Sequence, residues 1–316
     1  MEFIVKKTTE LTVAEKEQIA SLFNEVFDKN RTIQEFDNQY LNNPLGYSFH
    51  SLMLKDGIVV GHNSGIPCYY RVNGKRQLFV CNVDTMIKKQ CRGIDNFFDM
   101  MTHATNRYRE EGAAMLYGFP NDNSYPILKY IGLMEDIGKL DTYCLPYRIG
   151  GIKKSLSFLN LFSILFCRSW VVFSSCFASK QMKVFSVEKD ADSYNATRYK
   201  RNDGIYSIVK LDSFQFMYKI ITYEGVRTAF LVDVVNKSAR NFTKAVKYII
   251  QNEHINFDLI LYVGHLPFCN YGMIKFPRKF EPKHFNFTGF LLNEKDKDLL
   301  FNIESWDVNL SNYDLI

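Results

Sequence analysis

Two dipeptides, Asp56-Gly57 and Asn73-Gly74, most constrain how this chain can fold. Asn, Asp and Gly tolerate the positive φ angles of a two-residue hairpin turn, and apolar segments flank both dipeptides. The sequence therefore predicts two consecutive antiparallel hairpins. The expected strands are residues 51–55, 58–60, 64–72 and 77–80.

A different arrangement follows these hairpins. The strand pattern continues over Cys81–Ile87, and a helix is predicted over Asp95–Glu111, stopped by Gly112. A short strand over Ala114–Phe119 and a helix over Ser124–Tyr130 come next. Antiparallel strands followed by one strand–helix–strand crossover indicate a mixed sheet of α/β character.

Two helices are predicted ahead of the hairpins. Thr12 and Glu15 form a capping-box pattern, and apolar residues recur at helical spacing as far as Phe27. A second helix is predicted over Ile33–Leu41.

The second half of the chain partly repeats this order. A strand is predicted over Thr228–Val235, a helix over Asn241–Asn252 and a strand over Phe257–Val263. Ser213–Lys219 also resembles Gln34–Tyr40, so we interpret the pattern as a diverged internal duplication. Since 316 residues exceed one typical domain, two are expected. The predicted division is a first domain over 1–148, an apolar linker or helical segment over 149–182, and a second domain over 183–316.

One segment, Ser155–Ser179, is apolar apart from Arg168 and several serines. Because a membrane span needs about 20 apolar residues and Arg168 interrupts this run, we favour a buried or interdomain helix. An interfacial helix on a membrane is the second interpretation, since Lys153 and Lys154 suit anionic headgroups. A true span is the third.

Composition excludes some classes of function. The net charge of +5 is spread along the chain without an arginine-rich run, so nucleic-acid binding is not expected. Seven cysteines at irregular spacings, without a C-x-x-C pair, indicate reduced thiols in a cytoplasmic protein. Residues 1–10 lack a signal-peptide apolar region. The six histidines show no metal-ligand spacing, so no metal site is predicted.

The connection between the strand ending at Ile87 and the next helix carries the clearest chemical signal. Exposed amides at a helix start bind anions, and Lys88, Lys89 and Arg92 add positive charge. Gly93 permits close backbone approach and unusual dihedral angles. These features suggest a diphosphate-binding turn, although an ordinary strand–helix connection gives the same pattern.

Two stretches point to a family. The first is Asp84-Thr-Met with Cys91-Arg-Gly and Phe97, and the second runs from Gly118 to Leu133. At their spacing, they resemble the acetyl-CoA loop and the following strand and helix of the GCN5-related N-acetyltransferases (GNATs). The resemblance covers about residues 10–147, and it extends to the second half only by analogy. It implies a tandem GNAT-like acyl-CoA N-acyltransferase fold, with the second copy degenerate.

The resemblance also implies which residues contact the cofactor. Turn amides would bind its diphosphate, the preceding strand would contact the pantetheine arm, and two later residues would flank that arm. The implied strand residues are Met86, Ile87 and Lys88, the turn residues are Gln90, Cys91, Arg92, Gly93, Ile94 and Asp95, and the flanking residues are Asn121 and Ser124.

Two positions depart from the family pattern. Asp95 stands where the family has a small residue, which puts a negative charge near the diphosphate unless Asp95 acts as a helix cap. Leu128 stands where many members have the tyrosine that protonates the leaving thiolate. The nearby Tyr125 is kept as a catalytic candidate. Asp84 is a candidate base or amine-orienting group, and its alternative role is that of a structural carboxylate.

The resemblance implies an acyl-CoA-dependent N-acyltransferase that transfers acetyl from acetyl-CoA to a small amine or amino sugar. The alternative is a catalytically weakened ligand-binding or scaffold protein in surface-polysaccharide assembly, motivated by Asp95 and Leu128. The oligomeric state is not predicted.

Overall fold

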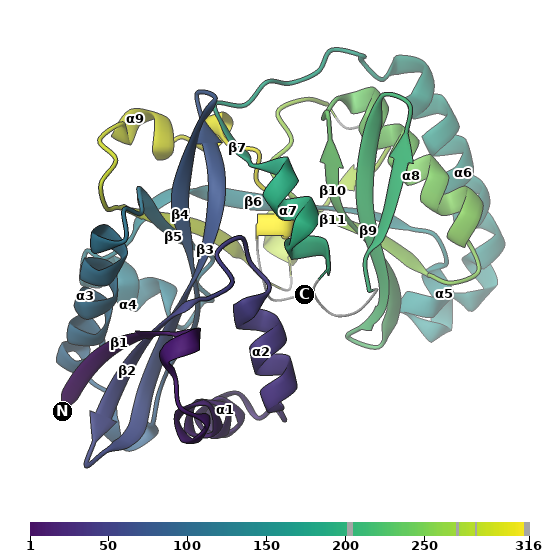
Figure 1. Ribbon diagram of the computed structural model, residues 1–316. Coiled ribbons are helices and arrows are strands. Elements are labelled where there is room, and N and C mark those ends of the chain that lie inside the picture. The colour runs from purple at the N-terminus through teal and green to yellow at the C-terminus, as the bar shows by residue number, and fades with distance from the viewer. Residues whose placement is uncertain (201–204, 270–271, 282, 313–316) are drawn as a thin grey trace. The chain divides into compact units, whose positions relative to one another are not determined.

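The computed structural model describes residues 1–200, 205–269, 272–281 and 283–312 (Figure 1). The chain forms two compact units. The first comprises 1–138, 186–203 and 285–306, and the second comprises 139–185, 204–284 and 307–316. This differs from the predicted division at 148 and 183. Segments 186–203 and 285–306 belong to the first unit because their strands pair with strands that are distant in sequence. Local sequence patterns do not predict such pairing.

The first unit begins with the expected hairpins. Asp56, Gly57, Asn73 and Gly74 all have positive φ angles, as two-residue hairpin turns require. β2 and β3 are joined by the first turn, and β3 and β4 by the second. β3 is one long strand where two short ones were expected. The strands are β1 (Glu2–Lys7), β2 (Phe49–Lys55), β3 (Ile58–Val72) and β4 (Lys75–Ile87).

The crossover that follows is also confirmed. α3 (Ile94–Glu110) leads to β5 (Met115–Gly118), which lies parallel to β4. The later strand β13 (Phe285–Leu291) then pairs antiparallel with β5, and β7 (Val187–Lys189) pairs with β3. The sheet of this unit has the order β1-β2-β3-β4-β5-β13.

Helices cover both faces of this sheet (Figure 1). α1 (Val13–Phe27) and α2 (Ile33–Leu41) begin with capping boxes at Thr12 and Thr32 and pack on one face. The opposite face receives α3, whose buried Met101 and Tyr108 join one apolar cluster with Phe49 of β2. The remaining helices of the unit are α4 (Tyr125–Tyr130), α7 (Ala191–Ala196) and α9 (Lys297–Leu300).

The second unit has its own mixed sheet, entered along β6 (Glu135–Pro146), in the order β6-β11-β10-β9-β8. β10 lies antiparallel to β9 and parallel to β11, and α8 (Ala239–Glu253) connects the parallel pair. The strands are β8 (Ser207–Leu211), β9 (Phe214–Tyr223), β10 (Val226–Val235), β11 (Leu259–Gly264) and β12 (Ile274–Lys275), which pairs with β6.

One predicted correspondence is wrong. Gln34–Tyr40 lies in helix α2, whereas Ser213–Lys219 leads into strand β9. Aromatic residues at Phe214, Phe216 and Tyr218 alternate with the residues between them, and this period of two is typical of a strand.

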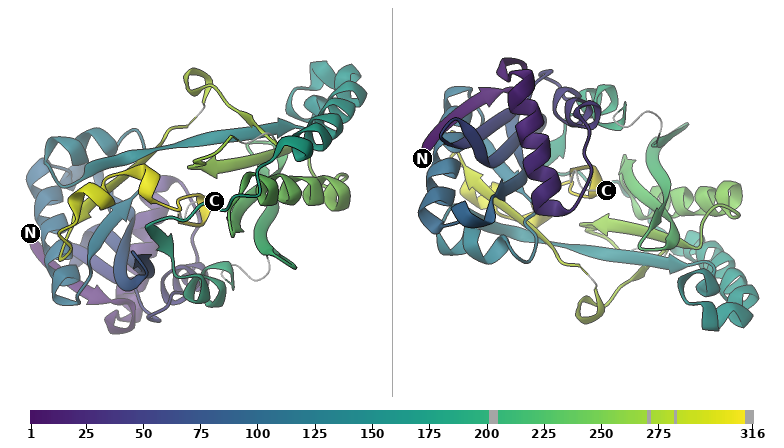
Figure 2. Two further views of the ribbon diagram at one scale, coloured as in Figure 1. Left: turned by 90° about the horizontal axis from the view of Figure 1, so that it is seen from above. Right: turned by 90° about the horizontal axis from the view of Figure 1, so that it is seen from below.

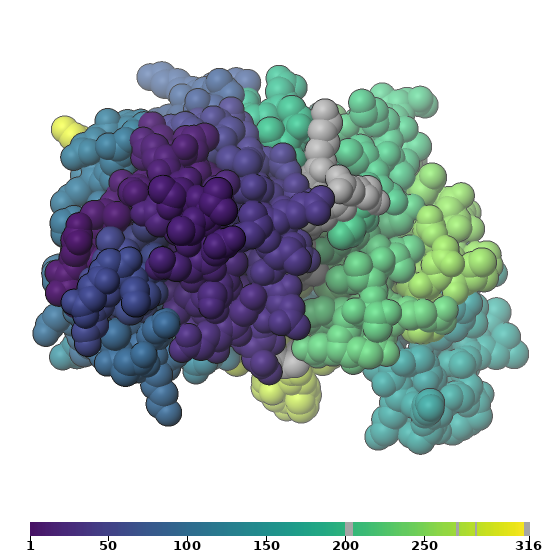
Figure 3. Space-filling model, turned by 60° about the horizontal axis from the view of Figure 1, so that its bottom comes forward, coloured from purple at the N-terminus to yellow at the C-terminus, as the bar shows by residue number. Residues whose placement is uncertain are grey.

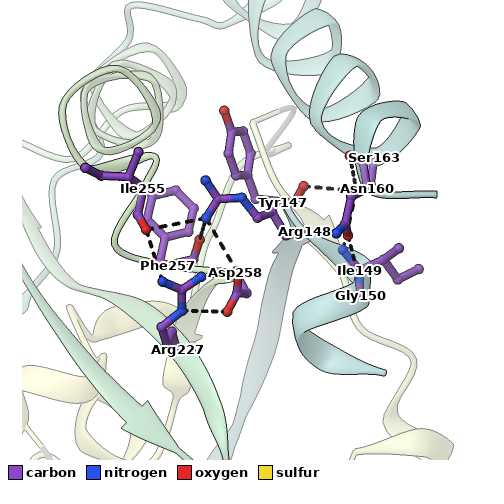
Figure 4. Close-up of polar contacts among 10 residues, drawn as sticks. All are labelled: Tyr147, Arg148, Ile149, Gly150, Asn160, Ser163, Arg227, Ile255, Phe257 and Asp258. Carbon is purple, nitrogen blue, oxygen red and sulfur yellow. Dashed lines mark hydrogen bonds and ion pairs between the residues drawn. The ribbon is translucent and has the colours of Figure 1, made fainter. Parts of the chain in front are cut away.

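The apolar segment forms α5 (Ile149–Ile152), a 3-10 turn and α6 (Asn160–Phe177). Polar contacts fix this segment to the end of β6 (Figure 4). The amide of Gly150 donates to Asn160 Oδ1 at 2.8 Å, and Ser163 Oγ donates to the Tyr147 carbonyl at 3.0 Å. Next to them, Arg227 forms a bidentate pair with Asp258 at 2.9 and 2.8 Å.

The expectation of a buried helix over 155–179 is wrong. α6 packs one narrow face against α8 (Figures 1 and 2), and its buried residues are Ser163, Cys167, Val171 and Ser174. Within the described residues, Lys154–Phe177 is the one helical stretch apolar and long enough to cross a membrane, and only 17% of its most apolar window is buried.

Candidate functional site

The candidate site lies where β4 and β5 separate. Their parallel pairing runs from Phe79–Met115 to Asn82–Gly118 and then ends, while β4 continues to Ile87. A Cβ on Gly118 would lie 3.3 Å from Asn82 Cβ, so a residue without a side chain suits this last pair. Past this point, no strand among the described residues pairs with that edge of β4.

A bulge in β4 follows immediately. Pairing with β3 shifts between Val83–Ser64 and Met86–His62, so two residues of β4 oppose one of β3. Asp84 has φ 49°, in the left-handed region. This bulge interrupts the simple alternation of strand faces between Asp84 and Met86.

Side chains from α2 and its preceding loop hold Asp84. Its Oδ2 accepts from Arg31 Nη1 at 2.7 Å, Tyr40 Oη at 2.5 Å and Gln39 Nε2 at 3.1 Å. Asp84 and Arg31 are 3% and 11% exposed, so the pair lies away from water. Burial and the adjacent carboxylate raise the pKa of Tyr40 well above its usual value. This geometry matches the structural alternative for Asp84, because one oxygen of the buried carboxylate accepts from three donors of the protein itself.

A pair of buried histidines lies beside this cluster. His50 Nδ1 and His62 Nε2 are 3.0 Å apart, and Thr8 Oγ1 contacts His50 Nε2 at 2.9 Å. Burial lowers the pKa of His62 to about 4, and burial also lowers that of His50 well below 6.5. Both imidazoles are therefore neutral at pH 7. Among the residues that the structure describes, no group of histidine, cysteine and carboxylate side chains could hold a metal ion.

The turn after β4 uses some of its own amides. Lys88 N donates to the Val60 carbonyl, Cys91 N to that of Lys88, and Arg92 N to that of Lys89. The Cys91 side chain is buried in an apolar cluster with Ile87 and Met100, so this turn residue can offer a ligand only its backbone. The amides of Cys91 and Arg92 thus support the turn itself.

The start of α3 is open. Gly93 is the N-cap residue, no side chain caps the helix, and the first helical amide bond runs from Phe97 to Gly93. The amides of Ile94, Asp95 and Asn96 therefore lie in the helix turn whose N–H groups have no intrahelical acceptor. Together with the helix dipole, this turn favours an anion.

Gly93 leaves the space at the start of α3 open because it has no side chain. Its φ of 173° is extended backbone, so the expectation of an unusual dihedral angle is wrong. A Cβ placed there would meet nothing closer than Asn96 Nδ2 at 4.0 Å, so the space above the helix start is free. Asp95 is exposed in the first turn of α3 and is not the N-cap residue, which corrects its proposed capping role.

Cations surround the opening. Lys88 lies 3.6 Å from Glu25 of α1, and Arg92 Nε donates to the Ile87 carbonyl at 3.1 Å. Lys89 and Arg92 are exposed. The side chains of Met86 and Ile87 are buried, so these residues can offer only their backbone to a ligand.

The segment after β5 makes mostly local contacts. Asn121 Oδ1 accepts from the amides of Asn123 and Ser124 at 3.0 and 2.9 Å and thereby fixes the turn into α4. Tyr125 Oη donates to Asp136 Oδ1 at 2.8 Å, and partial burial and this bond raise the pKa of Tyr125. Leu128 is buried in the core, so the position that the family uses for an acid has no proton to give.

Sequence reasoning missed Arg31, Gln39 and Tyr40. It also missed the hydrogen bonds of Thr85 with Asn63 at 2.6 Å and with Asn82 at 3.4 Å. Arg31, Gln39, Tyr40 and Asn63 precede the turn by more than 20 positions, and no local pattern connects them with it. The capping box of α2 was the one available signal, because it placed Gln39 and Tyr40 on one helix.

The second unit also has a strand that separates from its parallel neighbour before a helix start, but other residues fill the space there. β10 shifts register beside Asp233 and pairs with β11 only over Thr228–Phe230. The buried segment Val308–Asn312 contacts both strands, since Asn309 Nδ2 donates to Asp233 and Asn309 also bridges Gly264.

The helix start in this unit is covered as well. Ser238 Oγ accepts from the Asn241 amide at 3.1 Å, and Arg240 N donates to the Ser179 carbonyl at 3.0 Å. The α8 start therefore has a side-chain cap and a second backbone acceptor, which the α3 start lacks.

Residues 7–133 match the family model described as an acetyltransferase (GNAT) domain. No curated protein matches the chain. Several solved structures share its fold at 11% identity. An Enterococcus faecalis protein described as a probable N-acyltransferase aligns over 93% of this chain and 73% of its own, with a TM-score of 0.59.

Two further solved structures also share the fold. A GCN5-related N-acetyltransferase from Anabaena variabilis aligns over 92% of this chain and 73% of its own, with a TM-score of 0.57. Saccharomyces cerevisiae N-myristoyltransferase, solved with myristoyl-CoA bound, aligns over 92% and 79% with a TM-score of 0.53. The predicted mixed α/β fold is confirmed. Family membership of residues 183–316 stays a prediction.

Proposed function

Because residues 7–133 match the model of an acetyltransferase (GNAT) domain, we propose that this protein is an acyl-CoA-dependent N-acyltransferase that uses acetyl-CoA. One observation carries the proposal. β4 separates from β5 beyond Asn82–Gly118 and leads into a helix start that no side chain caps. A splayed strand edge beside open amides can hold both the arm and the diphosphate of an acyl-CoA.

The diphosphate would bind the amides of Ile94, Asp95 and Asn96, above the free space at Gly93. Lys89 and the guanidinium of Arg92 would add charge. The pantetheine arm would lie along the free edge of β4. Lys88 N bonds to β3, and because hydrogen bonds alternate along an antiparallel pair, the Ile87 amide faces away from β3.

The reaction needs few groups from the protein. A neutral amine attacks the thioester carbonyl and a tetrahedral oxyanion forms, and the positively charged nitrogen loses a proton to solvent. The carbonyl re-forms as the carbon–sulfur bond breaks, and the thiolate leaves with the electron pair and takes a proton. A backbone amide on the free edge of β4 would stabilise the oxyanion, a contribution typically worth about 10²–10³ in rate.

We assign Asp84 the role of holding the β4 bulge, because Arg31, Tyr40 and Gln39 already bind its carboxylate. Tyr125 stays the candidate donor of a proton to the thiolate, since its raised pKa keeps it protonated at neutral pH. Asn121 and Ser124 would border the arm from the turn that they stabilise.

The proposed acceptor is a small amine or amino sugar, and the proposed location is the cytoplasm. A second function is favoured by two observations. Asp95 brings negative charge to the open helix start, and Leu128 leaves the family's acid position without a proton. A protein with these features could bind acyl-CoA without transferring the acyl group.

Chromatographic measurement of free CoA distinguishes the two. The protein is incubated with acetyl-CoA and a panel of amines and amino sugars, and binding is measured in parallel by calorimetry. Acceptor-dependent release of CoA supports the transferase, with Tyr125→Phe expected to slow release about 10²-fold or more. Binding without release for any acceptor supports the second function. Absence of binding at high micromolar acetyl-CoA contradicts both.

A further inference from the structure

Helix α6 exposes an unusually apolar face. Eight large apolar residues between Phe158 and Phe177 are 42–79% exposed, including Leu161, Phe162 and Phe173. Figure 3 shows side chains from about residues 150–165 projecting from the surface of the second unit. Soluble proteins rarely expose an apolar patch of this kind without a binding role.

The packed and exposed faces of α6 lie on opposite sides. Ser163, Cys167 and Val171 recur every four residues and pack toward the second unit, whereas Leu161, Leu165 and Val172 fall about half a helical turn away. Asn160 binds the amide of Gly150 in α5, and Ser163 binds the carbonyl of Tyr147 after the end of β6 (Figure 4). The helix is thus held firmly with its apolar side outward.

The charged residues of the segment that contains this helix have one sign. From Thr142 to Val187 the sequence has six basic residues and no aspartate or glutamate. The six are Arg148, Lys153, Lys154, Arg168, Lys180 and Lys183. Lys153 and Lys154 stand exposed before α6, and Lys180 and Lys183 stand exposed after it. Cations therefore stand at both ends of an exposed apolar helix.

A groove adds to this pattern. A volume of about 280 Å³ opens between α6 and α8 and is bordered by Arg168, Lys247 and His254 together with Val171, Val172 and Ile250. It places two cations next to the apolar side of α6, at a depth that a negatively charged headgroup could reach.

We propose that α6 docks the protein on an anionic lipid membrane, with the helix axis in the plane of the interface. Phe and Leu side chains enter the acyl boundary, and the flanking lysines meet the headgroups. The helix does not span the bilayer, because its Ser163–Ser174 face is packed on α8 and Arg168 lies within it. Anionic lipid is a better occupant of this face than a second copy of the chain. The lipid carries charge opposite to the lysines, whereas a second copy carries the same cations.

Vesicle flotation of the full chain tests the proposal. The vesicles are pure phosphatidylcholine or an equal mixture with phosphatidylglycerol. We expect flotation with the anionic mixture, weaker flotation with the neutral lipid, and release by high salt or alkaline carbonate. Leu161→Glu with Phe173→Glu should weaken binding by about tenfold or more, because two apolar contacts become anionic.

Val13→Glu is the matched control. Val13 and Leu161 are each 70% exposed on a helix, so the substitutions alter surface of equal exposure. Val13→Glu should float like the wild type. Neither variant should change the melting temperature or acetyl-CoA binding, which separates this proposal from the proposed function.

Several outcomes would overturn the proposal. One is wild-type protein that stays with the soluble fraction in the presence of anionic vesicles. Others are a double variant that floats unchanged and bound protein that resists carbonate, which would indicate a span. Dimers in solution that the double variant dissociates, without lipid binding by the wild type, would identify a second copy as the occupant.

Discussion

The turns after β4 and after β10 show how one arrangement of elements can be open in one unit and closed in the other. Both strands follow a hairpin partner, shift register beside an aspartate, lose their parallel neighbour early and lead into a helix. Asp84 and Asp233 occupy the two bulges. The difference lies beyond the bulge, in the connection and at the helix start.

The β4–α3 connection is the longer one, running from Lys88 to Gly93, and it leaves the helix uncapped. The β10–α8 connection has three residues, Asn236–Ser238, and its last residue caps the helix. The segment Val308–Asn312 also fills the space beside β10. The comparison shows that strand splay and an open helix start are separate features, because both units have the first and only the α3 start has the second of these two helices.

Asp84→Asn should give the largest effect. Asn leaves the buried Arg31 without its carboxylate, so we expect a loss of about 3–5 kcal/mol in unfolding free energy. Hydrogen exchange should place the loss of protection in β2–β4 and leave β9–β11 protected. Asp136→Asn, on an exposed ion pair with Lys129, is the control and should stay within about 1 kcal/mol. Equal losses in the two variants would contradict the account of the β4 bulge.

Acid should weaken the first unit through His50 and His62. Their folded-state pKa values are depressed, so the unfolded chain binds more protons below pH 6.5 and stability is lost as pH falls from there toward about 4. Between pH 7 and pH 5 each imidazole should remove about 2 kcal/mol of unfolding free energy.

The measurement is denaturant unfolding at several pH values. His62→Asn should remove about half of the pH dependence and leave the part due to His50, whereas His103→Gln, on the exposed side of α3, should remove none. A pH dependence in His62→Asn equal to that of the wild type would show that other groups cause it.

Ser238→Ala should have an intermediate effect on the closed helix start. Loss of the cap on α8 typically lowers unfolding free energy by about 1 kcal/mol. Ser155→Ala, at an exposed position, is the control in the same urea titration. If Ser238→Ala matched this control, the cap would not distinguish the two helix starts.

Asp95→Asn should have the smallest effect and act in two directions. Removing the charge from the first turn of α3 should destabilise the protein by about 0.3–1 kcal/mol, because the helix dipole favours an anion there. The same change should tighten acetyl-CoA binding by about fivefold at low salt, since it removes repulsion of about 1 kcal/mol from the diphosphate. Calorimetry at low and high salt checks this, and an unchanged affinity would mean that Asp95 lies away from the diphosphate.

Much of the first unit could be predicted from local signals. The hairpin turns at Asp56-Gly57 and Asn73-Gly74, the capping box at Thr12 and the glycine after α3 each depend on neighbouring residues. For the same reason the turn that starts at Lys88 was located correctly. Three-dimensional pairing decides which amides of the turn form hydrogen bonds within the protein, as the bond from Lys88 N to the Val60 carbonyl illustrates.

The rest depended on contacts distant in sequence. β13 joins β5 across more than 160 residues, and Asn309 reaches Asp233 across 76, which no periodicity can reveal. Arg31 meets Asp84 for a similar reason. We expected the apolar run over α6 to form a buried or interdomain helix, because the hydrophobicity of a sequence does not show which side of a helix packs against the protein. Only the packing on α8 shows which of its faces is left exposed.

The number of acetyl-CoA molecules bound per chain tests the central comparison most directly. Calorimetry should give one site, lost in Gly93→Trp because the indole fills the free space above α3, and retained within about twofold in Arg240→Trp in the first turn of α8. Two sites per chain, or binding that survives Gly93→Trp and disappears in Arg240→Trp, would contradict the account.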